Sequence, residues 1–300
     1  MSKWDVDYIN LCKKILDEGV EVENRTGTNT IKIPSHHLHF DLSDEFPVLT
    51  TKQLYFKAAI IEMLWIYQQQ SNDVRWLQER GVKIWDEWEI AEDGYWRATQ
   101  MLPNAEGVLE KTEVEKYFGE EWAHTIGTAY GWIVKNFHLI DKLIDRLKNN
   151  PNDRRMVLSL WQDQFVDTAV LPSCVWSSEW DVTDGKLNAW VHQRSCDVPL
   201  GLPFNVTQYA VLLSLLAHCT GLEAGTIDWS IKDAHIYVNQ VDGIKEQIKR
   251  FDEQGHLPAP ELWINPDVTD FYEIDNSREL KDVKVKKYQH MGPIKFPIAQ

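Results

Sequence analysis

Cys174 is the first residue whose surroundings suggest chemistry. It lies in Leu-Pro-Ser-Cys-Val at 171–175, between two segments that alternate like strands, which predicts a turn rather than a helical core position. A cysteine attacks as the thiolate, and a nearby guanidinium lowers the thiol pKa. Cys174 beside Arg194 would therefore be an activated nucleophile. Spacing alone does not bring the two together, and an inert, buried thiol is the competing interpretation.

Four arginines are candidates for an anion site. The chain has no GxGxxG, no GxxxxGK followed by Ser or Thr, and no HExxH, so side chains would have to hold a phosphate. The planar fork of arginine binds phosphate oxygens in pairs. The candidates are Arg25, Arg154, Arg155 and Arg194. Residues 154 and 155 adjoin a strand-like run, and neighbours on a strand face opposite sides, so one could serve a local site and the other a partner. Solvated surface charge is the alternative.

Two further groups of polar residues fall where chemistry could use them. Glu62 interrupts an apolar helical stretch, so its carboxylate is either salt-bridged or raised in pKa for proton transfer. Asp233, His235 and Tyr237 are spaced by two, which places them on one face of a strand. That face could recognise hydroxyl groups. A satisfied structural network would give the same pattern.

Composition bounds the kind of protein. The chain has 300 residues, of which 43% are hydrophobic and 26% charged, as in ordinary globular proteins. A formal net charge of −15 argues against binding nucleic acid through its phosphates. The longest apolar run, 209–217, is shorter than the ~20 residues of a membrane helix, and the polar start lacks a secretory signal, so we expect a cytoplasmic protein. The cysteines at 12, 174, 196 and 219 lack metal-ligand spacing, and no metal site is predicted.

The elements that must position these residues alternate between helix and strand. Apolar periodicity predicts helices at 6–16, 58–66, 138–149 and 205–220, the last capped by Gly221. Residues 28–41 are expected as a strand pair around Pro34, and further strands at 156–161, 176–182 and 187–193. Residues 89–124 form an acidic surface insertion. We therefore expect one α/β (α+β) domain over 1–300, with a mixed β-sheet and packed helices.

Longer motifs, in order along nearly the whole chain, carry a resemblance. They are Arg-Thr-Gly-Thr at 25–28, Glu-Met-Leu-Trp at 62–65, Ile-Trp-Asp-Glu-Trp at 84–88, Tyr130-Gly131, Arg154-Arg155, Pro-Ser-Cys at 172–174, Gln-Arg-Ser-Cys-Asp at 193–197, Leu-Gly-Leu-Pro-Phe-Asn at 200–205 and Asp-Ala-His-Ile-Tyr at 233–237. This pattern closely resembles the thymidylate synthase family, and so implies a thymidylate synthase-like fold.

The resemblance implies a homodimeric enzyme that methylates dUMP to dTMP, with 5,10-methylenetetrahydrofolate as carbon donor and reductant and without a metal. Cys174 would add through sulfur to C6 of the uracil and make C5 a nucleophile. Arg194 would contact both the phosphate and the thiolate. The other phosphate ligands implied are Arg25, Ser195 and, from the second subunit, Arg154 and Arg155.

The resemblance also assigns the base, ribose and folate contacts. Asn205 would read the O4 and N3 edge of uracil, and an Asp there would favour cytosine. His235 and Tyr237 would hold the ribose hydroxyl. Glu62 would organise proton transfers through water, with Tyr130 helping to remove the C5 proton. The folate site would be lined by Ile84, Trp85, Trp88, Asp197, Leu200, Gly201, Phe204 and Ala299.

Two positions depart from the family pattern. Val175 stands where a histidine usually follows the nucleophile, which predicts a stronger dependence on Asn205 and ordered water. The tail ends in polar Gln300 rather than an apolar residue. The alternatives are a dUMP hydroxymethylase, in which water captures the methylene, and a non-catalytic nucleotide- or RNA-binding relative. The intact Cys174, Glu62, Arg194 and Asn205 argue against the second of these.

Overall fold

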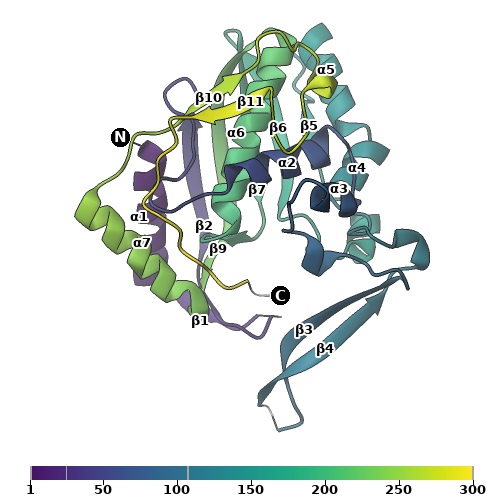
Figure 1. The fold of residues 1–300 in the computed structure, drawn as a ribbon, viewed down its shortest axis with the longest axis vertical. Helices are drawn as coiled ribbons and strands as arrows, with labels where there is room; N and C mark the ends of the chain where they lie inside the picture. Colours follow the sequence, from purple (N-terminus) through teal and green to yellow (C-terminus); the bar gives the residue numbers. More distant parts are fainter. Residues whose placement is uncertain (1, 25, 107, 299–300) are drawn as a thin grey trace.

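A mixed sheet forms the centre of the computed structural model, which describes residues 2–24, 26–106 and 108–298 (Figure 1). The strands run in the order β1 (Val20–Val22), β2 (Thr30–Asp41), β9 (Glu223–Tyr237), β7 (Lys186–Gln193), β6 (Val175–Thr183) and β5 (Val157–Ser159), with β8 (Cys196–Asp197) also pairing with β9. The pairs of β9 with β7 and β8 are parallel, and the others are antiparallel. The predicted mixed sheet is confirmed.

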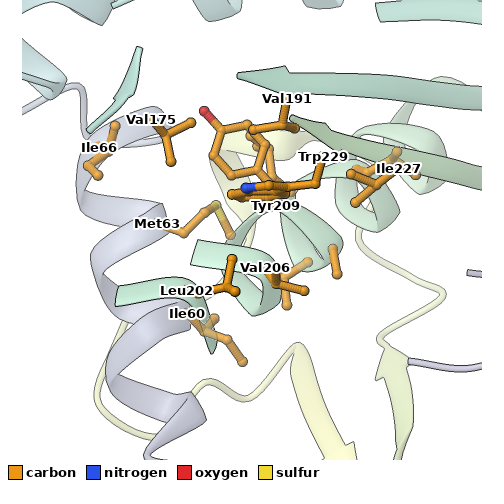
Figure 2. Close-up of a cluster of buried hydrophobic side chains, with 14 of the residues drawn as sticks. Ile60, Met63, Ile66, Val175, Val191, Leu202, Val206, Tyr209, Ile227 and Trp229 are labelled. Carbon is orange, nitrogen blue, oxygen red and sulfur yellow. The ribbon is translucent and has the colours of Figure 1, made fainter. Parts of the chain in front are cut away.

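Two apolar helices cover one face of this sheet. The longer, α6 (Gly201–Thr220), packs against α2 (Phe56–Tyr67) and against β7 and β9. Figure 2 shows their contact with the sheet, which involves Ile60, Met63 and Ile66 of α2, Leu202, Val206 and Tyr209 of α6, and Val175, Val191, Ile227 and Trp229 of the strands. By length and composition α6 could cross a membrane, but 83% of its apolar window is buried inside the molecule, as in a core helix.

The remaining elements surround this core. They are α1 (Lys3–Glu18), α3 (Arg75–Gln78), α4 (Gly131–Asn136), α5 (Leu139–Asn149), α7 (Val241–Gln254), the pair β10 (Glu261–Ile264) and β11 (Val283–Lys286), and the pair β3 (Tyr95–Pro103) and β4 (Leu109–Tyr117). Short 3-10 turns include η1 (Asp86–Trp88). The helices predicted around 6–16, 58–66 and 138–149 are thus present. Gly221 caps α6 in the left-handed region, with φ 72°.

Three predictions about local structure need correction. Residues 30–41 form one strand, not a pair, and its register with β9 omits Pro34, which has no N–H to donate. The irregularity opposite it, where Asp233 has φ 55°, lets the strand continue. Helix α6 begins at Gly201 and not at residue 205 as predicted, because Pro203 is tolerated in the first turn of a helix. Arg154 and Arg155 lie in an exposed turn before β5, so no strand places them on opposite faces.

The acidic segment 89–124 contains more order than its sequence suggests. Strands β3 and β4 pair along their whole length as a separate two-stranded hairpin, which projects from the rest of the molecule (Figure 1). Most of the described side chains of this hairpin are exposed or half-buried, which is why no alternation of apolar and polar residues marked it.

Candidate active site

Cys174 and Arg194 meet at the start of β6. The backbone N–H of Arg194 donates to the Cys174 carbonyl at 2.9 Å. The Arg194 side chain follows the same loop, with Nε donating to the Ser173 carbonyl at 2.9 Å and Nη2 to the Pro172 carbonyl at 2.7 Å. The guanidinium is therefore fixed against the loop that carries the half-buried Cys174. The structure brings together two residues that sequence spacing could not.

Tyr130 also contacts the loop that carries Cys174. Its hydroxyl accepts the Cys174 backbone N–H at 3.2 Å. Burial raises the pKa of the Tyr130 phenol well above its usual range, with the Cys174 thiol and Glu62 adding to the effect. The residue has φ 45° and ψ −107°, a rare backbone conformation for a non-glycine residue. Strain of this kind persists only where the surroundings enforce it, and it is common at functional sites.

Glu62 lies on α2 with 8% of its surface exposed. The indole Nε1 of Trp85 donates to Oε1 at 2.6 Å, and Nε2 of Gln208 donates to Oε2 at 2.5 Å. Burial raises the pKa of Glu62 from 4.5 to about 7, although both hydrogen bonds favour the ionised form. Of the two interpretations left open by the sequence, the structure favours a tuned carboxylate, because its partners are neutral donors and not a cation.

Asn205 lies in the first turns of α6, within a network of amides. Nε2 of Gln193 donates to its Oδ1 at 3.2 Å, and its Nδ2 donates to Oε1 of Gln208 at 3.1 Å. Sequence reasoning missed Gln208, although it was marked by the signal that revealed Glu62, a polar residue inside an apolar helix. It also assigned no role to Trp229, whose Nε1 donates to Oε1 of Gln193 at 3.0 Å.

Aromatic rings line the space beside Glu62. The Trp85 ring lies 5.6 Å from the Trp88 ring and 5.3 Å from the Tyr130 ring, both edge to face. Trp85 is nearly buried, with 6% exposed. The other proposed folate contacts with half-buried apolar side chains packed on the core are Ile84, Leu200 and Phe204. At Gly201 an added Cβ would lie 3.7 Å from Asn205 Oδ1, which is ordinary contact, so the backbone approaches Asn205 without crowding.

Asp197 presents a half-buried carboxyl near the start of α6. It accepts the Leu200 N–H at 3.0 Å and Nε2 of Gln240 at 3.3 Å. Burial raises its pKa, which these two donors and the nearby charges of His235 and Lys52 partly offset. Lys52 is itself buried, and burial lowers its pKa to about 8. Neither Lys52 nor Gln240 was singled out from the sequence.

The predicted polar face of β9 exists. Nδ1 of His235 lies 2.9 Å from Oδ1 of Asp233, and the rings of His235 and Tyr237 are 5.2 Å apart, edge to face. Lys32 Nζ lies 2.5 Å from Oδ2 of the same aspartate. The bond from His235, and then that from Lys32, lower the pKa of Asp233 to about 2. Four charged or polar side chains are therefore held in one cluster.

The remaining predicted site residues do not belong to the clusters described above. Ser195 is half-buried between β7 and β8. Arg155 pairs with Asp153, Nε to Oδ1 at 2.8 Å, and neighbouring Arg154 is exposed. Arg25, Ala299 and Gln300 lie outside the described residues. Within the described ranges, no group of three His, Cys, Asp or Glu side chains is arranged to hold a metal.

Comparisons with known proteins agree on one family. The family model described as thymidylate synthase matches residues 6–300. The chain is 46% identical over 299 residues to the thymidylate synthase of Clostridium beijerinckii and 37% identical over 318 residues to that of Bacillus phage phi3T, each alignment covering 100% of both chains. The solved structure of thermostable thymidylate synthase A from Bacillus subtilis matches with a TM-score of 0.80 and 35% identity, covering 99% of each chain. The chain therefore belongs to the thymidylate synthase family.

Proposed function

We propose that the chain converts dUMP to dTMP by reductive methylation, with 5,10-methylenetetrahydrofolate as co-substrate and dihydrofolate as second product. The observation that carries this proposal is the fixation of the Arg194 side chain on the Cys174 loop, beside Tyr130 and the buried Glu62. Membership of the thymidylate synthase family gives the reaction class.

Cys174 is the proposed nucleophile. Its sulfur adds to C6 of the uracil, and the electron pair displaced from the C5–C6 double bond makes C5 nucleophilic. The guanidinium of Arg194 is held by the carbonyls of Pro172 and Ser173, the two residues before Cys174. A guanidinium near a thiol favours the thiolate form, which is the role proposed for Arg194. Asn205 keeps one amide hydrogen and one oxygen lone pair beyond those used by Gln208 and Gln193, which suits the O4 and N3–H of uracil.

The proposed folate site lies against the aromatic residues beside Glu62. When bound, methylenetetrahydrofolate supplies the one-carbon unit and the hydride. The indoles at 85 and 88, which lie edge to face, offer the flat apolar surfaces that a pterin and a benzoyl ring need. Asp197 offers a half-buried carboxyl to ring N–H groups. The full set proposed is Ile84, Trp85, Trp88, Asp197, Leu200, Gly201, Phe204 and Ala299, of which the last lies outside the described residues.

Glu62 and Tyr130 are proposed to handle protons. The two donors on Glu62 fit its carboxylate form, whereas burial favours the neutral acid, so both forms are accessible near neutral pH. Tyr130 keeps its proton because its pKa lies far above neutrality, and its hydroxyl is held next to Cys174. Glu62 therefore exchanges protons through water, and Tyr130 orients the acceptor that removes the C5 proton.

The phosphate and ribose contacts complete the proposal. His235 and Tyr237 would hold the ribose hydroxyl from the end of β9. The phosphate ligands proposed are Arg25, Arg194 and Ser195 from one subunit and Arg154 and Arg155 from its partner. The exposure of the last two in a turn is compatible with a role across an interface.

A homodimer would use the sheet face that faces away from α2 and α6. Side chains on this face include three exposed apolar residues, Val157 at 47%, Trp176 at 37% and Trp190 at 49% exposed. Exposed aromatic residues on an open sheet are typical of protein interfaces. Val157 follows Arg155 by two residues, so assembly through this face would bring residues 154 and 155 to the partner.

We also propose a cytoplasmic location and one catalytic domain over 1–300 with a variable insertion at 89–124.

One reaction tests the proposal. Enzyme, dUMP and methylenetetrahydrofolate are mixed, dihydrofolate is followed by absorbance, and the nucleotide is weighed by mass spectrometry. We expect dihydrofolate to form in step with a methylated nucleotide. A hydroxymethyl nucleotide without dihydrofolate would instead identify a hydroxymethylase. Cys174→Ala should lose turnover by about 10³-fold or more, whereas Cys219→Ala, at the far end of α6, should retain it.

A further inference from the structure

Gln208 is hydrogen-bonded to two residues of the proposed site, Asn205 and Glu62. It lies three residues after Asn205 on α6, hence on the same helix face, and is 5% exposed. Both halves of its amide are occupied, because Nε2 donates to Oε2 of Glu62 at 2.5 Å and Oε1 accepts from Nδ2 of Asn205 at 3.1 Å. A buried amide is unfavourable unless it is hydrogen-bonded. This amide bonds one residue of α2 to one of α6.

The direction of these bonds is fixed from the other end of the network. The indole Nε1 of Trp229 can only donate, so the atom of Gln193 beside it must be the oxygen. Nε2 of Gln193 then faces Asn205, which must accept through Oδ1 and donate through Nδ2. Reversing any one amide would place two donors or two acceptors against each other. Gln208 must therefore turn its NH₂ group toward Glu62.

We propose that Gln208 is a positioning residue that couples the amide reading the pyrimidine, Asn205, to the carboxylate handling protons, Glu62. This inference rests on the proposed function. Val175, which follows Cys174, has no hydrogen-bonding group in its side chain and is packed among apolar residues near Tyr209 (Figure 2). The hydrogen-bonded connection from Asn205 to Glu62 therefore runs through Gln208, and base binding at one end polarises the bond at the other.

The electrostatic consequence falls on Glu62. Its carboxylate is stabilised by the donors from Trp85 and Gln208 against the effect of burial. The titratable group that faces it from another element is the Tyr130 hydroxyl, with Cys174 and the charge of Arg194 behind that residue. The phenol stays protonated at neutral pH. Loss of the Gln208 donor therefore raises the pKa of Glu62 without adding or removing another charge.

The test compares Gln208→Met, which keeps length and burial but removes both polar groups, with Gln208→Glu, which places a second carboxylate beside Glu62. The control is Gln247→Leu, which removes a buried amide of α7 that donates to Thr51 Oγ1 at 2.8 Å. Rates are measured against pH with dUMP and methylenetetrahydrofolate. We expect Gln208→Met to move the acid limb of kcat upward by about one pH unit and Gln208→Glu to move it further. The KM for dUMP should also rise, because Asn205 loses a partner.

A second measurement does not depend on turnover. The ligand-free enzyme is labelled with ¹³C at glutamate carboxyls, and the Glu62 resonance is assigned by its loss in Glu62→Gln. Its titration midpoint should rise in both Gln208 variants and stay at the wild-type value in Gln247→Leu. An unchanged midpoint together with an unchanged pH profile in Gln208→Met would overturn the coupling. Wild-type enzyme that leaves dUMP unmethylated would overturn the proposed function, while the carboxyl titration would still decide the role of Gln208.

Discussion

The indole of Trp85 donates a hydrogen bond of 2.6 Å to the carboxylate of Glu62, so an aromatic residue of the proposed folate site is bonded directly to the group proposed to handle protons. The same indole lies edge to face against Tyr130, at 5.3 Å between ring centroids. Trp85 therefore has two roles that a substitution can separate, since its ring area and its N–H group are chemically independent.

Trp85→Phe keeps most of the aromatic area and removes the N–H donor. The pKa of Glu62, raised by burial to about 7, should rise further because the ionised form loses one of its two donors. We expect the acid limb of kcat to move upward by about one pH unit. A pH profile of turnover measures this. Trp263→Phe on β10 is the control, and an unchanged acid limb in Trp85→Phe would contradict the role given to the N–H group.

Asn205→Asp should change which pyrimidine is accepted. An ionised aspartate still accepts from Gln193, but it can no longer donate to Gln208 or to uracil O4. We expect kcat/KM for dUMP to fall by about 10²-fold and the activity with dCMP to rise. Mass spectrometry of the methylated products measures both. Asn188→Asp on β7 provides a matched control, and equal losses with the two nucleotides would argue against base reading by residue 205.

The elements that the sequence predicted best are those whose apolar residues follow one period. Helix α5 and strand β7 fall near their predicted positions because one face of each is buried. The hairpin β3–β4 was missed because neither face is buried well enough to impose alternation. Sequence spacing could not pair Cys174 with Arg194, because Arg194 bonds to the backbone carbonyls of residues 172–174, and such bonds leave no trace in residue type.

The family resemblance named candidate residues for the site but not the bonds between them. Gln208 is the clearest example, since its role depends on contacts with Glu62 and Asn205 that only the packing of α2 against α6 creates. Burial also decides the behaviour of Glu62, and the apolar helix pattern offered that as one of two interpretations. The sequence could not choose between a salt-bridged Glu62 and a Glu62 whose pKa is raised for proton transfer. The three-dimensional environment of the carboxylate favours the second interpretation.

Val175→His should destabilise the protein without changing base selectivity. Val175 is 4% exposed, and Figure 2 shows it near Ile66, Met63 and Tyr209, so an imidazole would be too large and too polar for its place. We expect the free energy of unfolding to fall by ~1–3 kcal/mol, as measured by urea denaturation, with Val175→Ile as an apolar control. Because Gln208 already bonds to Asn205, the ratio of dUMP to dCMP turnover should stay the same. A poorer ratio would contradict this.

Asp233→Asn should lower thermal stability at neutral pH and have less effect in acid. His235 and then Lys32 lower the pKa of Asp233 from 3.8 to about 2, so its ionised form is favoured by folding. This contribution is present above pH 4 and is lost as the pH falls toward 2. Tm values from pH 3 to 7 measure the difference from wild type, which should narrow below pH 4. Asp252→Asn, which removes an exposed pair with Lys13, should change Tm little, and a gap of constant size would contradict the linkage.

Trp190→Glu should break the proposed dimer. The Trp190 side chain is 49% exposed, and its ring stacks on that of His192 at 5.8 Å, so it presents a flat aromatic surface on the open sheet face. A carboxylate there would be buried on assembly near Glu179, a costly arrangement of like charges. Light scattering should show twice the chain mass of 35.0 kDa for wild type and the single mass for the variant.

The activity of Trp190→Glu separates assembly from folding. If Arg154 and Arg155 complete the phosphate site of the partner, separated subunits should lose at least ~10-fold in kcat/KM while keeping their far-ultraviolet circular dichroism. The control Val108→Glu also replaces an exposed apolar residue by a carboxylate, but in the projecting hairpin, where Val108 is 58% exposed. This variant should remain dimeric and active. A dimeric Trp190→Glu would place the interface elsewhere. A monomeric variant with full activity would show that the phosphate site is complete within one subunit.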